Sequence, residues 1–244
     1  MVKKAVDNVK ESGENIDIKG YIKRILMIAK GLPVSLEVIS TSTEDMIAEG
    51  IRLYKMFNPV AKNVYIKIPI NPTFEEGSEE SFNGIKAIKK LSQMGIPINC
   101  TLVFTPEQAL MAAKSGASFV SPFAGRIDDY IRKTNNIKFK KSDYFPAEGI
   151  SREGKSLNDN GIVSGVDLVS KIVKVFKNYG IKDTLVLAAS IRNPRQVREV
   201  ALAGADIATL LFGVLKDLLK HFKTMEGMKA FTGDVVPEYR DLFN

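Results

Sequence analysis

Lys67 has the least usual setting of any ionisable residue in this sequence. It lies in the middle of VYIKIPI, an apolar run from Val64 with the length and composition of a buried strand. Side chains alternate along a strand, so Val64, Ile66 and Ile68 would pack under helices. Lys67 would then point to the opposite face. A lysine whose surroundings favour the neutral amine is the nucleophile of Schiff-base enzymes. The position alone also fits a structural lysine paired with a carboxylate, or one that reaches solvent at a strand end.

Other polar side chains fall on the same face by the same alternation, near the ends of other strand-like runs. They are Glu37, Asn99, Thr101, Ser121, Ser190 and Arg192, and Arg126 follows directly after one of these runs. Active sites of α/β barrels lie at the carboxyl ends of the strands, so we expect one shared pocket there. Arg126 and Arg192 could hold the phosphate of a bound sugar. Taken singly, each residue also has a structural explanation, such as satisfying local backbone groups or capping a helix.

A scaffold of alternating strands and helices would bring these side chains together. Amphipathic stretches separate the apolar runs, and Thr105-Pro106 and Asn193-Pro194 are signals that start helices. Ser42 or Thr43 would start another helix, which we expect to end at about Phe57. This alternation is typical of βα units around a parallel sheet. The predicted strands are VSLEVIS from Val34, VYIKIPI from Val64, IPINCTLVF from Ile96, SFVSPF from Ser118, TLVLAASI from Thr184 and DIATLLF from Asp206.

The chain length and the strand count point in different directions. The 244 residues lie close to the ~250 of one eight-stranded α/β barrel. Only six strands are recognisable, however, and residues 1–17 hold no plausible strand. We therefore predict an α/β fold with one TIM-type (β/α) barrel domain over 1–244 that lacks the first two βα units. A polar segment at about 130–164 would be an insertion, either a solvated excursion or a lid. Residues from about 213 to 244 would form a helical tail.

Composition narrows the class of protein. One cysteine excludes an intrachain disulfide framework, and one histidine argues against a Ser-His triad or a multi-histidine metal site. No apolar run reaches the ~18 residues of a membrane span. The net charge of +7 comes from dispersed lysines and arginines rather than from a basic stripe. We expect a soluble cytoplasmic protein with neither a nucleic-acid nor a membrane partner.

Several motifs, in order along the chain, resemble the transaldolase family, specifically its small microbial transaldolases and fructose-6-phosphate aldolases. The motifs are VSLEV, VYIKIP, NCTLVF, FVSPFAGRIDD, LAASIRNPRQV and ALAGADIATL. The resemblance runs from about Glu11 to about Gly227 and is interrupted by the predicted insertion. It implies a class I aldolase-type barrel that needs no metal and no organic cofactor. It also implies ketose phosphate and aldose phosphate substrates, and a ring-based homo-oligomer that uses the C-terminal helices.

The resemblance assigns roles to individual residues. Lys67 matches the family's Schiff-base lysine, and Glu37 and Thr101 match a pair that orders a catalytic water. The matching substrate and phosphate pocket consists of Asn99, Ser121, Phe123, Arg126, Ser190 and Arg192. The related aldolases tend to have glutamine in place of Glu37 and tyrosine in place of Phe123. Both differences favour a transaldolase, because the missing phenol would assist release of free dihydroxyacetone.

The sequence departs from the family at its beginning. Family members start with a strand that carries a proton-transferring aspartate and a second strand that ends in T-T-N-P, and neither is present here. Six strands cannot close with the geometry of eight, so two sheet edges would be exposed. The missing strands would either have been lost from an ordinary enzyme or be replaced by the insertion or a neighbouring subunit. Three functions remain open: transaldolase of the pentose phosphate pathway, fructose-6-phosphate aldolase, or a catalytically impaired barrel that acts as an oligomeric or interaction protein.

Overall fold

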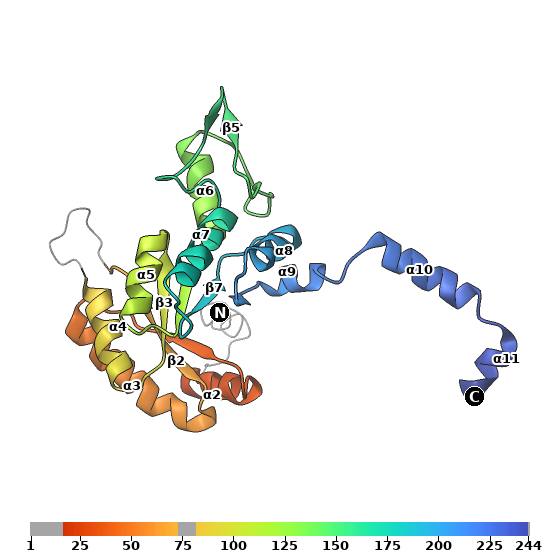
Figure 1. Cartoon of the computed structure of the whole chain (residues 1–244). Helices are drawn as coiled ribbons and strands as arrows, with labels where there is room; N and C mark the ends of the chain where they lie inside the picture. The colour runs from red at the N-terminus through yellow and green to blue at the C-terminus, as the bar shows by residue number, and fades with distance from the viewer. Residues whose placement is uncertain (1–16, 73–81, 244) are drawn as a thin grey trace.

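The computed structural model describes residues 17–72 and 82–243, which form a curled parallel sheet with helices packed on its outer face (Figure 1). The six strands lie in the order β1-β2-β3-β4-β7-β8 and pair in parallel. All six predicted strands are confirmed, although each is shorter than its apolar run. Their bounds are β1 Val34–Glu37, β2 Val64–Pro69, β3 Ile98–Val103, β4 Phe119–Pro122, β7 Leu185–Ala188 and β8 Ile207–Ala208.

The helices begin where the sequence signals predict. Ser42, Thr105 and Asn193 each accept a hydrogen bond from the backbone N–H three residues later. The predicted end at Phe57 is wrong, because the first of these helices passes through Pro59 and ends at Ala61. The main helices are α2 Ile18–Ile28, α3 Thr43–Ala61, α4 Asn83–Gln93, α5 Pro106–Lys114, α6 Ala124–Thr134, α7 Gly165–Asn178 and α8 Pro194–Leu202.

The two faces of the sheet bury different sets of side chains. Val64, Ile66 and Ile68 of β2 belong to the large core between the sheet and the helices, as strand alternation predicts. A smaller cluster forms on the inner face around Phe119 of β4, whose ring stacks on Tyr65 at a centroid distance of 4.6 Å. Lys67 lies on this inner face, two residues along β2 from Tyr65. The inner face therefore combines the stacked rings of Tyr65 and Phe119 with Lys67.

The sheet has two edges within the described residues. There, β1 pairs only with β2, and β8 only with β7. The arrangement is the curled parallel sheet of a TIM-type barrel, with six strands placed. The prediction that two earlier βα units are lacking concerns residues 1–16, which lie outside the described residues.

The segment predicted as an insertion packs against the helices beside it. It carries a short exposed hairpin, β5 Ser151–Arg152 and β6 Lys155–Ser156. Phe145 and Ile162, on either side of the hairpin, are buried in the main core. The Arg132 guanidinium of α6 donates hydrogen bonds to two backbone carbonyls of the segment, at 3.1 and 2.7 Å. The hairpin therefore projects into solvent, while both flanks are anchored to the core.

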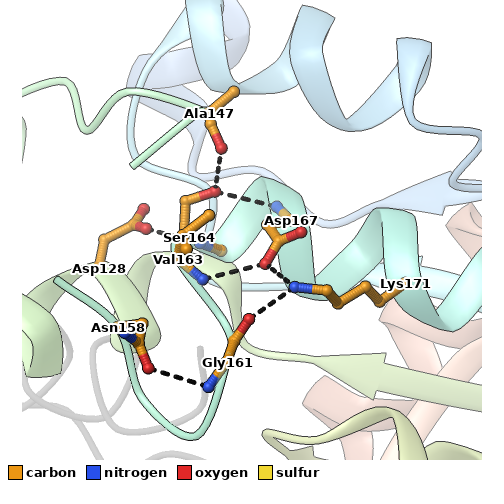
Figure 2. A network of polar contacts seen from close by, with 9 residues as sticks. Asp128, Ala147, Asn158, Gly161, Val163, Ser164, Asp167 and Lys171 are labelled. Carbon is orange, nitrogen blue, oxygen red and sulfur yellow. Dashed lines mark hydrogen bonds and ion pairs between the residues drawn. The ribbon is translucent and has the colours of Figure 1, made fainter. Parts of the chain in front are cut away.

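Hydrogen bonds at the start of α7 hold the end of the segment at about 130–164 against the rest of the fold (Figure 2). The Ser164 hydroxyl donates to the Ala147 carbonyl at 2.6 Å and accepts from the Asp167 backbone N–H at 3.0 Å. Lys171 pairs with Asp167 and also donates to the Gly161 carbonyl at 2.7 Å. These contacts hold the turn before α7 to the helix that follows it.

Beyond β8 the chain continues as a helical tail that extends away from the body (Figure 1). Its elements are α9 Phe212–Asp217, α10 Phe222–Gly233, α11 Pro237–Arg240 and a 3-10 helix at Asp241–Phe243. Many of its large apolar side chains are exposed, among them Phe222 and Phe231, at 67% and 72%. No helix in residues 17–72 and 82–243 is both long enough and apolar enough to cross a bilayer.

Candidate functional site

Lys67 and Glu37 meet on the inner face of the sheet. They are register partners on β2 and β1, and the Lys67 Nζ lies 3.5 Å from the Glu37 Oε2. The Lys67 side chain is 23% exposed and the Glu37 side chain 54%. The amine is thus partly sheltered but still reachable from solution, as a nucleophile that must meet a substrate carbonyl has to be.

Asn99 continues this polar row onto β3, where it is the register partner of Lys67. Its amide nitrogen donates to the Ser35 hydroxyl of β1 at 2.9 Å, and its amide oxygen accepts from the Ser121 hydroxyl of β4 at 2.6 Å. Both Asn99 and Ser121 are buried. The Asn99 side-chain amide therefore links β1, β3 and β4 on the face that carries the Lys67 amine. Sequence reasoning missed Ser35, although it lies two residues before Glu37 and so on the same strand face.

Thr101 lies two residues after Asn99 on β3, opposite Pro69 of β2. It is fully buried, and its hydroxyl oxygen has no hydrogen-bond partner among the described residues. Directly after it, the pairing of β3 with β4 shifts between Cys100 and Val103, and Leu102 takes a positive φ of 59°. Strand alternation therefore holds up to Thr101 and fails immediately beyond it.

The Phe123 ring joins the amine to the first arginine. The Lys67 Nζ lies 5.7 Å from the ring centroid, and the Arg126 guanidinium carbon lies 4.6 Å from it. Phe104 packs edge-on against the same ring at 5.9 Å. Phe123 directly precedes α6, so it brings the start of that helix to the inner face. The Lys67 amine and the Arg126 guanidinium therefore both contact the Phe123 ring.

Arg192 approaches the same helix from the other side. Its guanidinium Nη2 lies 3.0 Å from the Asp129 Oδ2 of α6. A Cβ at Gly125 would come within 2.6 Å of the Arg192 Nε and within 2.2 Å of the Ser190 carbonyl. Ser190 itself has a positive φ of 63°. Arg126 and Arg192 thus flank the first turn of α6, where helix N–H groups favour anions.

Two acidic residues of this site were missed by sequence reasoning. Asp128 is buried, and burial raises the pKa of its carboxyl to about 7. It accepts hydrogen bonds from the Gly165 backbone N–H at 2.7 Å and from the Gln196 side chain at 2.8 Å. Asp129 pairs with Arg192, as described above. Both acids belong to the FVSPFAGRIDD motif. The sequence signal that could have revealed them is an acidic pair shortly after the start of a predicted helix.

A cavity of about 340 Å³ opens beside Arg126. Its walls are Phe104, the α6 residues Arg126, Ile127 and Tyr130, and Asp159 from the segment before α7. The anchored segment therefore contributes a side chain to the pocket next to the arginine. No group of three or more His, Cys, Asp or Glu side chains that could hold a metal occurs within the described part of the chain.

The fold and the site together define an α/β enzyme of TIM-barrel type with a lysine on its inner strand face. A family model for transaldolase/fructose-6-phosphate aldolase matches residues 1–240. The chain belongs to this family and is an enzyme of the transaldolase type. Similar proteins include probable transaldolases of Thermoplasma volcanium (40% identical, 92% of this chain and 80% of that protein) and Desulfosudis oleivorans (40%, 92% and 82%). A third, from Chlorobium phaeobacteroides strain DSM 266, is 41% identical over 89% of this chain and 76% of that protein.

Proposed function

We propose that this enzyme transfers a dihydroxyacetone unit from a ketose phosphate to an aldose phosphate through a Schiff base on Lys67, as in the pentose phosphate pathway. The observation that carries the proposal is the position of the Lys67 amine. It lies 3.5 Å from a carboxylate and contacts the ring on which Arg126 stacks. In this proposal Lys67 is the nucleophile, Glu37 the proton carrier and Arg126 a phosphate-binding cation, and the contacts that support it are the Lys67–Glu37 pair and the shared Phe123 ring.

The chemistry begins when the Lys67 ammonium gives a proton to the Glu37 carboxylate and the freed amine attacks the ketose carbonyl, which gives a carbinolamine. Glu37 then gives this proton to the carbinolamine hydroxyl, which leaves as water, and an iminium forms. The iminium at C2 accepts the electron pair of the C3–C4 bond while the C4 hydroxyl gives its proton to water, so an aldose phosphate departs and a three-carbon enamine stays on Lys67. The enamine carbon then attacks the aldehyde of a second aldose phosphate, whose oxygen takes up a proton from water. Hydrolysis of the new iminium releases the product ketose phosphate and restores the amine.

Thr101 and Glu37 would order the water for the dehydration and hydrolysis steps. Buried hydroxyls rarely lack a partner, and a bound water is the usual one where protein offers none. The Thr101 hydroxyl has no such protein partner within the described residues and lies on the strand face shared with Asn99. A water held there could exchange protons with the Glu37 carboxylate. Asn99 and Ser121 would contribute hydrogen bonds to the sugar hydroxyls.

The phosphate would lie at the start of α6. Arg126 contacts the Phe123 ring just before the helix, and Arg192 packs over Gly125 in its first turn, where Ser190 also approaches with its backbone carbonyl. Charge-assisted hydrogen bonds from two guanidinium groups suit a dianionic phosphate. Binding at this end fixes the carbonyl carbon against the Lys67 amine.

Transfer to an acceptor, rather than release of dihydroxyacetone, follows from Phe123. Release as in fructose-6-phosphate aldolase requires a proton donor to the enamine carbon. The side chain that packs on Lys67 here is an apolar ring without a hydroxyl. The enamine therefore persists until an aldehyde captures it.

We also propose a cytoplasmic homo-oligomer that needs no metal or organic cofactor. The tail supports assembly with a second copy. A hollow of about 500 Å³ there is lined by Leu219, Phe222, Met225 and Met228, among other residues. The alternative, a catalytically impaired barrel that serves as an oligomeric protein, is favoured by the open sheet edges within the described residues.

Borohydride trapping tests the chemistry. Incubation with fructose 6-phosphate and borohydride should add one reduced dihydroxyacetone unit to the wild-type chain, at Lys67 by peptide mass mapping. K67M should take no label, while K174M, which removes an exposed lysine of α7, should label like the wild type. Without an acceptor aldehyde, little free dihydroxyacetone should appear. An unlabelled wild-type protein that is folded and assembled would support the impaired-barrel alternative instead.

A further inference from the structure

Two consecutive acids of α6, Asp128 and Asp129, both act on Arg192. The Asp129 Oδ2 lies 3.0 Å from the Arg192 Nη2, and both side chains are largely buried, at 14% and 20% exposure. The pair is therefore shielded from solvent, unlike the exposed ion pairs of the tail. Shielding makes the contact strong enough to hold one orientation of a long, flexible side chain.

Asp128 acts on the backbone of the same residue through Gln196. The Gln196 Nε2 donates to the Asp128 Oδ2 at 2.8 Å, and the Gln196 Oε1 accepts from the Arg192 backbone N–H at 2.8 Å. Gln196 is itself 3% exposed. Arg192 is thus fixed at its main chain through one acid and at its guanidinium by the next.

Gly125 shows how closely the Arg192 side chain packs against the first turn of α6. A Cβ there would approach the Arg192 Nε to 2.6 Å and the Cγ to 2.9 Å. The arginine side chain therefore crosses directly over the backbone of the first turn of α6. Its Nε is buried without a hydrogen-bond partner in the described structure, and so is the free Asp129 Oδ1. Asp129 contacts the Nη2 of the Arg192 guanidinium, and the other nitrogens of the guanidinium keep N–H donors for a ligand.

We propose that Asp129 is a positioning residue that holds the Arg192 guanidinium ready to bind the phosphate group of the substrate. The inference rests on the proposed function for the identity of the substrate, but phosphate binding can be measured without turnover. Removing the carboxylate has two opposing effects. It leaves the site more positive, which attracts an anion, and it frees the guanidinium to adopt orientations that bind none. Because the pair is shielded and in direct contact, the loss of orientation is the larger effect.

Titration of inorganic phosphate into the whole protein, followed by calorimetry, tests the inference. D129A should weaken phosphate binding about tenfold, the scale of one lost hydrogen bond to a charged group. D129N should bind phosphate better than D129A, because its amide oxygen still accepts from the guanidinium. D183N removes the same unit of charge from an exposed loop and should bind like the wild type.

The concentration dependence of borohydride trapping gives a second readout. In D129A the concentration of fructose 6-phosphate at half-maximal labelling should rise about tenfold, and that of unphosphorylated fructose should not change. Unchanged or tighter phosphate binding in D129A, equal losses in D129A and D129N, or equal losses for both sugars would each overturn the inference. If D129A does not fold, D129N alone must still bind phosphate more weakly than the wild type. Wild-type protein that binds phosphate but takes no label would contradict the proposed function and leave the positioning role standing.

Discussion

At the scale of single residues, the inner face of the sheet combines Lys67, which forms a long ion pair, with the Phe123 ring, which carries no hydroxyl. The Lys67–Glu37 pair is long, at 3.5 Å, and its carboxylate is half exposed. Such pairs contribute only about 0–1 kcal/mol to stability. In the proposed mechanism the contact can therefore be given up when the amine attacks a carbonyl. The pair is better explained by chemistry than by stability.

Replacing Phe123 with tyrosine should change the fate of the enamine. The ring centroid lies 5.7 Å from the Lys67 Nζ, so a phenol hydroxyl would enter the pocket of the bound intermediate. F123Y should release more free dihydroxyacetone from fructose 6-phosphate without an acceptor, by about tenfold or more if the phenol acts as a general acid. An enzyme-coupled dihydroxyacetone assay measures this. F104Y, which alters the neighbouring ring, serves as the control, and equal release from both variants would contradict the prediction.

Asp128 should make stability depend on pH. Burial raises its pKa in the folded protein from 3.8 to about 7. The folded state therefore binds this proton more tightly than the unfolded state does, and the stabilisation present below about pH 4 is lost as the pH rises towards 7. Measured by urea unfolding, the free energy of unfolding of the wild type minus that of D128N should fall between pH 5 and pH 8, by on the order of 2 kcal/mol. A difference that stays constant would show that Asp128 does not titrate in this range.

At the scale of elements, the start of α7 secures the long segment that follows α6. Ser164 is 1% exposed and bonds both its own helix and the Ala147 carbonyl (Figure 2). One hydroxyl thereby ties the returning chain to the helix. The segment reaches the pocket through Asp159, so its anchoring also shapes the wall beside Arg126.

Ser164→Ala should therefore destabilise the protein. The change removes a helix cap and leaves a carbonyl without its donor, which together cost about 1–2 kcal/mol. Ser170→Ala, at an exposed site of the same helix, is the matched control and should change stability by less than about 0.5 kcal/mol. Urea unfolding of both variants makes the comparison. Equal changes in the free energy of unfolding would mean that the Ser164 cap stabilises the protein no more than an exposed serine of the same helix does.

At the scale of the whole molecule, the tail exposes apolar surface that a monomer would leave in water. Phe222 and Phe231 of α10 are 67% and 72% exposed, and Leu219 is 86% exposed. Contiguous exposed apolar side chains mark interaction surfaces. A second copy of this chain is the partner expected here.

The double variant F222S/F231S should form smaller assemblies than the wild type. Burying one phenylalanine contributes about 1.5–3 kcal/mol, so losing two at each contact should shift dissociation into the micromolar range or above. Light scattering over a range of protein concentrations measures the mass. K229A, which removes an exposed charged side chain from the same helix, should leave the mass unchanged. A monomeric wild type would contradict the proposed assembly.

The sequence by itself was sufficient for the six strands and for the strand face that carries Lys67, Glu37 and Asn99. Strand alternation placed Lys67, Glu37 and Asn99 on one face, because side-chain direction in a strand depends only on position along the chain. Helix starts at Thr105 and Asn193 were equally local, since the capping hydrogen bonds span three residues. The family followed from motifs that lie within these same elements.

Only the tertiary structure decided how distant segments meet. Asp128 and Asp129 lie more than sixty residues before their partners Gln196 and Arg192, and no local pattern reports such a pairing. The helix through Pro59 and the register shift after Thr101 were likewise settled by packing, which can outweigh local preference. The residues capable of chemistry could be read from the chain, whereas the contacts that aim them depend on which elements the fold brings side by side.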